Sequence, residues 1–381
     1  MYRIKIILFF ILAFSISNCY SQLLPLSKNA TVTLITCGSG AEIYSLFGHT
    51  AIRIKDDEMH IDQVYNYGTF DFNTPNFYLK FVRGNLQYMA SSNSFNDFMN
   101  EYQLDHRSVY EQVLNFSQQQ KQQLFDDLNR ALVSSERYYT YKFIDKNCTT
   151  MVLDILNKTL GQKVLVKTRD TDKTYREILF PYFVDHFYTN LGISIFFGRK
   201  VDLMGERIFL PSELHDSAAK AVYNGQPLVV ENRAIIEFPP LKVPMSWWDN
   251  LYSLSLLMVL VVIANNNKIY VMFFFVFGLL GLFFSLAGFY SLHKELESNY
   301  NILLFNPLLL VLVYFYLKNN IKGSYIVSLL CLASLAVYGI IMAYKIHLFI
   351  VLPLIIASVT GLIKIALMNR KLLASVKQDG A

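Results

Sequence analysis

The sequence predicts an α+β domain on the outer side of a membrane, followed by an all-α bundle of five transmembrane helices. The chain of 381 residues is 53% hydrophobic and only 17% charged, whereas soluble domains average ~45–50% and ~25%. The excess apolar residues lie in 246–368, while 22–245 has the composition of a water-facing folded domain. The chain also begins with a segment typical of an export signal.

The N-terminus has the three parts of a signal peptide. A basic start precedes an apolar run over 6–16, and small residues lead up to Gln22, so we expect 1–21 to be the signal peptide and to be cleaved. Without cleavage the same segment would be a membrane anchor. In another interpretation Cys19 is a lipidation site, although Ile16-Ser17-Asn18 matches a lipobox poorly. In each case the domain that follows is exported.

A short predicted strand and a turn precede the first candidate catalytic residue, and a second predicted strand follows it. The segment 30–36 is apolar and β-branched, and residues 50–54 alternate in polarity with the period of a strand. His49 opens that second strand, where the preceding Gly48 lets the backbone approach closely and leaves one face of the imidazole free. The alternative is a purely structural histidine at a strand end.

Aromatic residues and glycines fill 65–88, which predicts strands and tight turns. The next segment, 116–135, predicts a helix, because Ser117 and Gln120 have the spacing of a capping box and an apolar stripe follows them.

Cys148 opens a second predicted helix. Apolar residues recur after it at helical spacing, Gly161 is a natural stop, and Asn147 or Asp145 could be the N-cap. The free N–H groups and partial positive charge of a helix start favour a thiolate, which is the nucleophile, and could hold an oxyanion. The alternatives are a buried core cysteine or a disulfide with Cys37. Residues that could orient His49 or hold an oxyanion are Asn147, Asn66, Asp71, His60 and Glu42.

The five predicted spans are Trp247–Ala264, Ile269–Leu292, Ile302–Leu317, Gly323–Ala343 and Leu348–Leu367. A span needs about 20 apolar residues, with about 17 as the lower limit, so the first and third are marginal. Trp247 and Trp248 stand where an aromatic belt is expected. The loops and the tail, 369–381, that this topology places in the cytoplasm carry most of the flanking cations, as the positive-inside rule requires: Lys268, Lys318, Lys322, Arg370, Lys371 and Lys377.

The outer loop 291–301 and the Asn306-Pro307 pair are unusually polar for a membrane domain. Polar groups at membrane depth are usually buried against protein or face a cavity, so this region could contribute to the site through His293, Asn299, Asn301 and Asn306. The alternative is a solvated loop followed by a proline-kinked helix.

Composition excludes several classes of protein. The net charge of +5 comes largely from cations beside apolar segments, so no nucleic-acid partner is expected. Four cysteines and 15% aromatic residues exclude a disulfide-knotted scaffold and a disordered chain. The cysteines and histidines also lack the paired spacing of zinc ligands, so no metal or cofactor is expected.

A histidine at a strand start that precedes a cysteine at a helix start resembles the order found in circularly permuted, papain-like NlpC-type proteins such as lecithin–retinol acyltransferase. More specific motifs resemble the Lnb family of bacterial lipoprotein N-acyltransferases. They occur at 36–53, 66–72, 81–84, 147–150, 209–211 and, in the membrane part, 293–307. The sequence departs from that pattern at Ser39, where proline is expected, and at Leu304-Phe305, where tryptophan is common.

The resemblance implies a function and a place in the cell. A membrane phospholipid would donate an acyl chain to Cys148, with His49 as the base, and the Cys148 thioester would pass it to the N-terminal amine of a diacylated lipoprotein. The enzyme would lie in the bacterial inner membrane, with the catalytic domain in the periplasm and His293, Asn299 and Asn301 binding headgroups or shaping the mouth of the site. Two alternatives stay open: a membrane-tethered cysteine hydrolase (a phospholipase or cell-wall peptidase), and a non-enzymatic envelope protein with a Cys37–Cys148 bridge.

Overall fold

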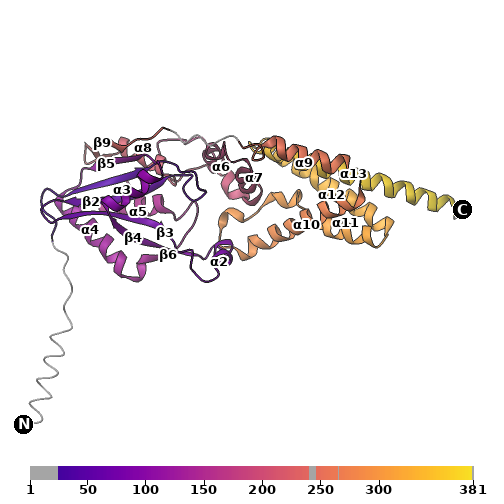
Figure 1. The fold of residues 1–381 in the computed structure, drawn as a ribbon, viewed down its shortest axis with the longest axis horizontal. Coiled ribbons are helices and arrows are strands. Elements are labelled where there is room, and N and C mark those ends of the chain that lie inside the picture. The colour runs from indigo at the N-terminus through magenta and orange to yellow at the C-terminus, as the bar shows by residue number, and fades with distance from the viewer. Residues whose placement is uncertain (1–24, 240–245, 265, 380–381) are drawn as a thin grey trace, which may run out of the picture.

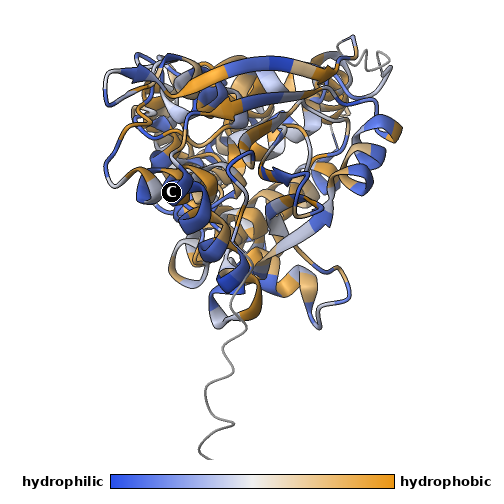
Figure 2. Ribbon diagram, turned by 90° about the vertical axis from the view of Figure 1, so that its left-hand side faces the viewer, coloured by the Kyte–Doolittle hydropathy of each residue, from blue (hydrophilic) through white to orange (hydrophobic). Residues whose placement is uncertain are grey.

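The computed structural model of the protein describes residues 25–239, 246–264 and 266–379. It has an N-terminal sheet domain and a C-terminal helical region, which lie end to end (Figure 1). Figure 2 shows hydrophilic and hydrophobic residues interspersed along the strands and helices of the sheet domain, as expected for a domain that faces water. The predicted signal peptide, 1–21, and Cys19 lie outside the described residues.

The sheet has seven antiparallel strands in the order β6-β4-β3-β2-β1-β5-β9. Their bounds are β1 Thr31–Cys37, β2 His49–Asp56, β3 Ile61–Thr69, β4 Gln87–Ser94, β5 Val109–Leu114, β6 Tyr138–Thr140 and β9 Val229–Ile236. A separate hairpin joins β7 Val222–Tyr223 to β8 Gln226–Pro227. The strands predicted before and after the first turn are therefore confirmed as β1 and β2, and β2 lies in the middle of the sheet.

Helices cover both faces of this sheet. One face carries α3 Phe95–Leu104, and the other carries α4 Gln118–Val133, α5 Cys148–Leu160 and α8 Pro211–Lys220. The same part of the chain also contains α2 Phe77–Arg83, α6 Tyr175–Leu179 and α7 Phe187–Phe196. Successive residues of a strand point to opposite faces, and the two cores follow this rule. Leu34 belongs to the core that includes apolar residues of α4 and α5, while the next residue, Ile35, belongs to the core that includes Phe98 of α3.

Both helices predicted in the sheet domain are confirmed. Ser117 and Gln120 form the expected capping box of α4, and α5 starts at Cys148 and ends at Gly161 in the left-handed conformation. The prediction for 65–88 was incomplete, because α2 lies between the strands β3 and β4. This helix has only seven residues and buries none of them, so it gives no periodic apolar stripe to detect.

The helical region contains α9 Leu251–Ile263, α10 Asn267–Tyr290, α11 Leu308–Leu317, α12 Ile321–Met342 and α13 Leu348–Asp379. In the part of the chain that the structure describes, α10, α12 and α13 are long and apolar enough to cross a membrane. A bent pair, Lys294–Leu303 with Leu308–Leu317, is a fourth candidate, with a bend of 41°. The helix α9, with 13 residues, is shorter than a usual span. The last helix continues beyond Leu367 into the predicted tail.

The bend before α11 has a local cause. Pro307 lacks the N–H group that a continuous helix would need there, and it is the N-cap of α11. The side chain of Asn306 accepts a hydrogen bond from the N–H of Leu308, the first residue of α11, at 2.9 Å. The carbonyl of Phe305 lies so close to α10 that a Cβ at Gly281 would be 1.5 Å from its oxygen. Glycine at 281 therefore permits the broken segment to pack directly against a span.

Candidate functional site

The start of α5 holds Cys148 in a fixed position. Asn147 is the N-cap, and it forms a reciprocal capping box with Thr150: the Thr150 N–H donates to Asn147 Oδ1 at 2.9 Å, and the Asn147 N–H donates to Thr150 Oγ1 at 2.8 Å. The Asn147 side chain is buried and its Nδ2 donates to the carbonyls of Phe143 and Phe209, each at 2.9 Å. Asn147, and not Asp145, is therefore the cap, and Cys148 is the first residue of the helix.

The position of His49 is fixed by the close approach of the turn before β2 to the end of β1. It is paired with Cys37 in the β1–β2 register, and Gly48 before it has a φ of 81°. A Cβ at position 48 would lie 2.4 Å from the Cys37 carbonyl oxygen. Only glycine fits this conformation and this contact, so the turn fixes where the imidazole begins.

Packing of α5 across β2 brings the two reactive residues together. The hydroxyls of Thr50 and Thr149, the residues that follow His49 and Cys148, are hydrogen-bonded at 3.1 Å in the core. The charges of the imidazole and the thiol act on each other, and each shifts the pKa of the other. The structure therefore brings residues 49 and 148 within reach of proton transfer.

Asn66 fixes the orientation of the imidazole. It lies on β3, next to β2, and its Oδ1 is 3.1 Å from His49 Nε2. The Asn66 Nδ2 donates to Asn93 Oδ1 at 3.3 Å, so its oxygen is the atom that faces the histidine. In this assignment Nε2 carries the proton, which leaves Nδ1 as the nitrogen that can accept one.

The pKa of Cys148 is lowered and the pKa of His49 is raised, so each shift favours the charged form of its group. Burial raises the pKa of Cys148, but the charge of His49, its hydrogen bond, and hydrogen bonds from the Thr50 N–H and the Thr149 hydroxyl outweigh burial, so this pKa lies below its usual range. Burial lowers the pKa of His49, but the Cys148 thiolate and the hydrogen bonds to Cys148 and Asn66 raise it above its usual value. The arrangement favours a thiolate–imidazolium pair, which is a reactive nucleophile.

Residues around the thiol were missed by the sequence analysis. A Cβ at Gly68 would lie 3.8 Å from the Cβ of Cys148, so the backbone of β3 approaches the cysteine closely. The phenols of Tyr139 and Tyr141 also lie near the thiolate, which together with burial raises the pKa of both. Alternate spacing in the run 138–141 placed these two tyrosines on one face of a strand, which was the available signal.

Three of the proposed orienting residues do not contact the histidine. His60 lies in the turn after β2, at the opposite end of the strand from His49. The Asp71 carboxylate accepts the N–H of Asn73 in its own loop at 2.8 Å, and Glu42 is exposed in the loop before β2. These residues therefore do not orient His49, because the strand register selects Asn66 instead.

The alternative of a disulfide between Cys37 and Cys148 is not supported, because no such bond is present among the described residues. Cys37 and Cys148 are both free thiols, and Cys37 is buried. Burial raises the pKa of Cys37 to about 12, against smaller opposite effects of Tyr102 and Arg107. Cys37 is therefore an inert core thiol, in contrast to Cys148.

Two asparagines of the outer loop hold the end of α7. Asn299 Nδ2 donates to the carbonyls of Ile195 and Phe196, each at 2.9 Å, and Asn301 Nδ2 donates to the Ser194 carbonyl at 3.1 Å. Both side chains are buried. Their hydrogen-bonding groups are therefore used within the protein, which corrects the expectation that they bind headgroups.

The other two polar residues of this region also have partners in the protein. His293 Nε2 lies 2.8 Å from the Phe81 carbonyl, which joins the outer loop to α2. Asn306 Nδ2 donates to Ser334 Oγ of α12 at 3.0 Å. These residues shape the junction between the sheet domain and the helical region.

Ion pairs and a hydrogen bond of two lysines connect the segment before Cys148 to the outer loop. Lys200 Nζ bonds to Asp145 and lies 3.4 Å from Glu295 Oε1. Lys142 Nζ donates to the Leu292 carbonyl at 2.6 Å. The helix α5 therefore starts close to the loop that follows α10.

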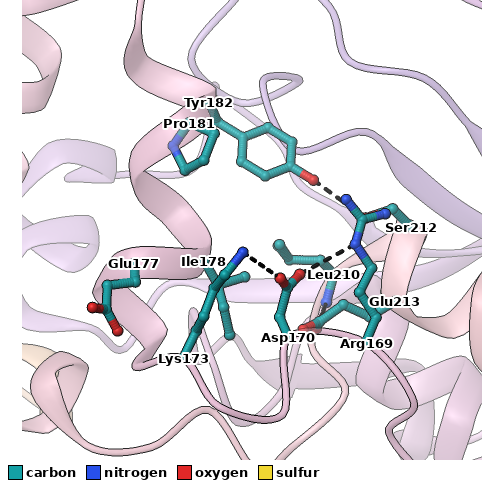
Figure 3. Close-up of a pocket in the computed structure, with 10 residues that line it drawn as sticks. All are labelled: Arg169, Asp170, Lys173, Glu177, Ile178, Pro181, Tyr182, Leu210, Ser212 and Glu213. Carbon is teal, nitrogen blue, oxygen red and sulfur yellow. Dashed lines mark hydrogen bonds and ion pairs between the residues drawn. The ribbon is translucent and has the colours of Figure 1, made fainter.

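A cavity of about 210 Å³ lies elsewhere, between α6 and α8. Three of its charged residues pair with one another: Figure 3 shows Lys173 and Arg169 turned toward Asp170, with contacts of 2.6 Å and 3.2 Å. Neither Cys148 nor His49 lines this cavity. Within the described ranges no group of three or more His, Cys, Asp or Glu residues could hold a metal ion.

Comparison with known families gives two matches, in chain order. The family described as the Lnb N-terminal periplasmic domain matches residues 23–179, which include His49, Asn66 and Cys148, and the Lnb transmembrane domain matches 239–371. No curated protein and no solved structure matches the chain. These families indicate a membrane-associated lipoprotein-processing enzyme with a periplasmic domain. The chain belongs to the Lnb family.

Proposed function

We propose that the protein is a lipoprotein N-acyltransferase that moves an acyl chain from a membrane phospholipid, through a Cys148 thioester, to the N-terminal amine of a diacylated lipoprotein. The observation that supports this most is the pairing of Cys148 with His49 at the start of α5, beside the outer loop of the membrane region. A nucleophile in this position can reach a lipid ester at the membrane surface.

In the first half-reaction the Cys148 thiolate attacks an ester carbonyl of the phospholipid. A C–S bond forms and the ester C–O bond breaks, while free N–H groups at the start of α5 stabilise the oxyanion. The His49 imidazolium gives its proton to the oxygen of the leaving lysophospholipid. Asn66 acts as a positioning residue, because it holds the imidazole through Nε2 while Nδ1 handles the proton.

In the second half-reaction the neutral α-amine of the diacylglyceryl-cysteine attacks the thioester. The C–N bond forms, the C–S bond breaks, and His49, now neutral, takes the proton that the amine loses. The thiolate–imidazolium pair is thereby restored. Amide formation from a thioester is downhill, so the cycle needs no ATP.

We further propose the topology predicted from the sequence: a signal peptide at 1–21, a periplasmic domain at 22–245, five spans in 246–368 and a cytoplasmic tail at 369–381, in the inner membrane. Contacts of the outer loops support it. The loop after α10 bonds to Lys142 through Leu292, and the loop after α12 bonds to Asp202 through Lys345 at 2.9 Å. Both loops therefore lie on the side of the sheet domain. A circularly permuted papain-like fold is part of this proposal.

The span count can be tested with reporter fusions after Asn266, Lys318 and Asp379. Five spans place all three points in the cytoplasm, where a fused fluorescent protein fluoresces and a fused alkaline phosphatase is inactive. Phosphatase activity after Asn266 would show that α9 does not cross the membrane.

The mechanism is tested by trapping the acyl-enzyme. Purified protein in phospholipid nanodiscs, without acceptor, should gain the mass of one acyl chain on the peptide that contains Cys148. Cys148→Ala should abolish the adduct, and His49→Ala should slow its formation by about 10²–10⁴-fold, the usual contribution of a general acid–base group. An acyl group found elsewhere, or none on wild-type protein, would exclude this mechanism.

A cysteine hydrolase with the same pair is the second candidate, because the geometry of Cys148 and His49 does not select amine over water. Labelled phospholipid incubated with and without a diacylated lipopeptide separates the two. N-acylated lipopeptide is the product of the proposed transferase, whereas free fatty acid as the only product would identify a phospholipase.

A further inference from the structure

The helix α2 presents an apolar surface that the protein does not cover. None of its seven residues is buried, and Tyr78 and Leu79 are 79% and 70% exposed. Phe72, just before the helix, is 64% exposed, and Phe81 and Val82 are also exposed. We call these five residues the α2 surface. A short helix in a water-facing domain rarely exposes so many large apolar side chains together, and such a patch marks an interaction site.

Hydrogen bonds fix the depth of α2 relative to a membrane-spanning helix. The Leu292 N–H donates to the Arg83 carbonyl at 2.7 Å, and Ser291 Oγ donates to the Val82 carbonyl at 2.9 Å. Residues 291 and 292 directly follow α10, which is long and apolar enough to span a bilayer. The end of α2 therefore lies level with the outer end of this span, and Figure 1 shows α2 beside that end of α10.

Other side chains at this level have the character of a membrane interface. Phe289 and Tyr290 at the end of α10 are exposed, and so is Trp247 before α9; aromatic residues are enriched at both edges of a bilayer. The polar residues of α2 are Lys80 and Arg83, with no acidic residue in its first turn. Apolar side chains together with cations suit a phospholipid leaflet.

We propose that the α2 surface inserts into the outer leaflet of the bilayer and forms the entrance through which the acyl donor reaches Cys148. The second part of this proposal rests on the proposed function. It is supported by a continuous row of rings from α2 toward the thiol. The rings of Phe81, Phe77 and Phe70 follow one another at 6.4 Å and 6.0 Å.

The row continues from Phe70 to Tyr88 at 5.2 Å and from Tyr88 to Tyr141 at 4.5 Å. Phe70, Tyr141 and Cys148 pack against the same core cluster. Phe70 is also two residues after Gly68, where a Cβ would lie 3.8 Å from the Cβ of Cys148. The row therefore places aromatic side chains without a break from the α2 surface to the neighbourhood of the nucleophile, and the proposed entrance follows this row.

Insertion is tested by photo-crosslinking, which does not depend on activity. The photoreactive residue benzoylphenylalanine replaces Leu79 or Val82 in the full chain, in nanodiscs of phosphatidylethanolamine and phosphatidylglycerol. Irradiation should add the mass of one phospholipid. The same replacement at Phe289, which is 94% exposed at the end of α10, is the positive control, and at Val133, 87% exposed at the end of α4, the negative control. Lipid adducts at 289 but not at 79 or 82, or a crosslinked dimer at 79, would overturn the proposal.

The entrance is tested with the double variant Leu79→Asp/Val82→Asp. Formation of acyl-Cys148 from nanodisc phospholipid should fall at least about tenfold, because charged residues keep α2 out of the leaflet. The rate of Cys148 alkylation by iodoacetamide should stay at the wild-type value. Equal loss of both would mean that α2 supports the structure of the site and is not the entrance. If wild-type protein forms no acyl-Cys148, the proposed function fails, while the lipid adduct at 79 still decides insertion.

Discussion

At residue scale, the chemistry depends on how Cys148 and His49 share one proton. The thiol has a lowered pKa and the imidazole a raised one, because the charged form of each stabilises the charged form of the other. The thiolate appears as the pH rises through the pKa of Cys148, and the acid that protonates the leaving group is lost as it rises through the pKa of His49. Acyl transfer should therefore have a bell-shaped pH profile.

Alkylation of Cys148 measures the first of these steps by itself. The rate with iodoacetamide should rise with pH at a midpoint below that of an ordinary cysteine, because only the thiolate reacts. In His49→Ala the midpoint should move to higher pH, since the largest effect that lowers the pKa of Cys148 is lost. Identical profiles in wild type and variant would show that the two residues do not form an ion pair. Cys37, buried and with a raised pKa, should stay unmodified.

Asn66 provides a second prediction at this scale. Asn66→Ala removes the acceptor of the His49 Nε2 proton, so the imidazole loses the hydrogen bond that fixes its orientation. We expect kcat to fall by up to about tenfold, in proportion to one hydrogen bond, with KM little changed. Asn93→Ala is the matched control, because it removes only the group that supports Asn66. A change in KM alone would show that Asn66 acts on the substrate instead.

At element scale, the glycine before β2 and the glycine that ends α5 can be compared for their effect on stability. Gly48 and Gly161 both have positive φ, of 81° and 72°. A Cβ at 48 would strike the Cys37 carbonyl, whereas a Cβ at 161 has nothing within 4 Å. Gly161→Ala should lower the free energy of unfolding by about 1–2 kcal/mol, and Gly48→Ala by about 3 kcal/mol or more with loss of activity. Equal effects in chemical unfolding would contradict the close contact at 48.

The caps of α4 and α5 give a parallel test. Ser117→Ala removes one exposed capping bond and should cost about 1 kcal/mol. Asn147→Ala removes the cap of α5 and leaves the carbonyls of Phe143 and Phe209 without their donor, so we expect about 2–4 kcal/mol. Thermal unfolding of the full chain measures both. A milder effect at 147 than at 117 would be inconsistent with the buried network.

The elements differ in how well the sequence predicts them, for physical reasons. The helices after Ser117 and Cys148 were predictable because caps and apolar periodicity are local. Asn66 was only one of several candidates, because its selection depends on cross-strand register with β2. The same holds for Tyr139 and Tyr141, which reach the thiol through the tertiary fold. The helix α2 has no buried face, so no local pattern of apolar residues predicted it.

At the scale of the whole molecule, buried ion pairs join the two regions. Asp202 of the sheet domain pairs with Arg176 at 2.7 Å and with Lys345 of the loop after α12 at 2.9 Å. Burial raises the pKa of Asp202, but the charge of Arg176 and hydrogen bonds from its neighbours outweigh burial and hold this pKa below its usual range. A lowered pKa means that the pairs stabilise the fold above about pH 4, the unfolded value, and that this stability is lost at lower pH.

Asp202→Asn should therefore destabilise the protein by about 3–5 kcal/mol, because it leaves the buried Arg176 guanidinium without its carboxylate partner. Glu231→Gln is the matched control: it removes an exposed pair with Arg233 and should change stability by no more than about 1 kcal/mol. Denaturant unfolding in detergent micelles measures both at neutral pH. If both variants unfold like the wild type, the pairs do not hold the two regions together.

Several independent ties attach the sheet domain to the membrane region: the ends of α2 and α10, Lys142 with Leu292, Lys200 with Glu295, and Asp202 with Lys345. So many anchors keep the reactive sulfur at a constant height above the lipid. In the proposed transferase, this constant height would restrict the reaction to donors and acceptors that diffuse laterally in the bilayer and carry their reactive groups at the level of Cys148.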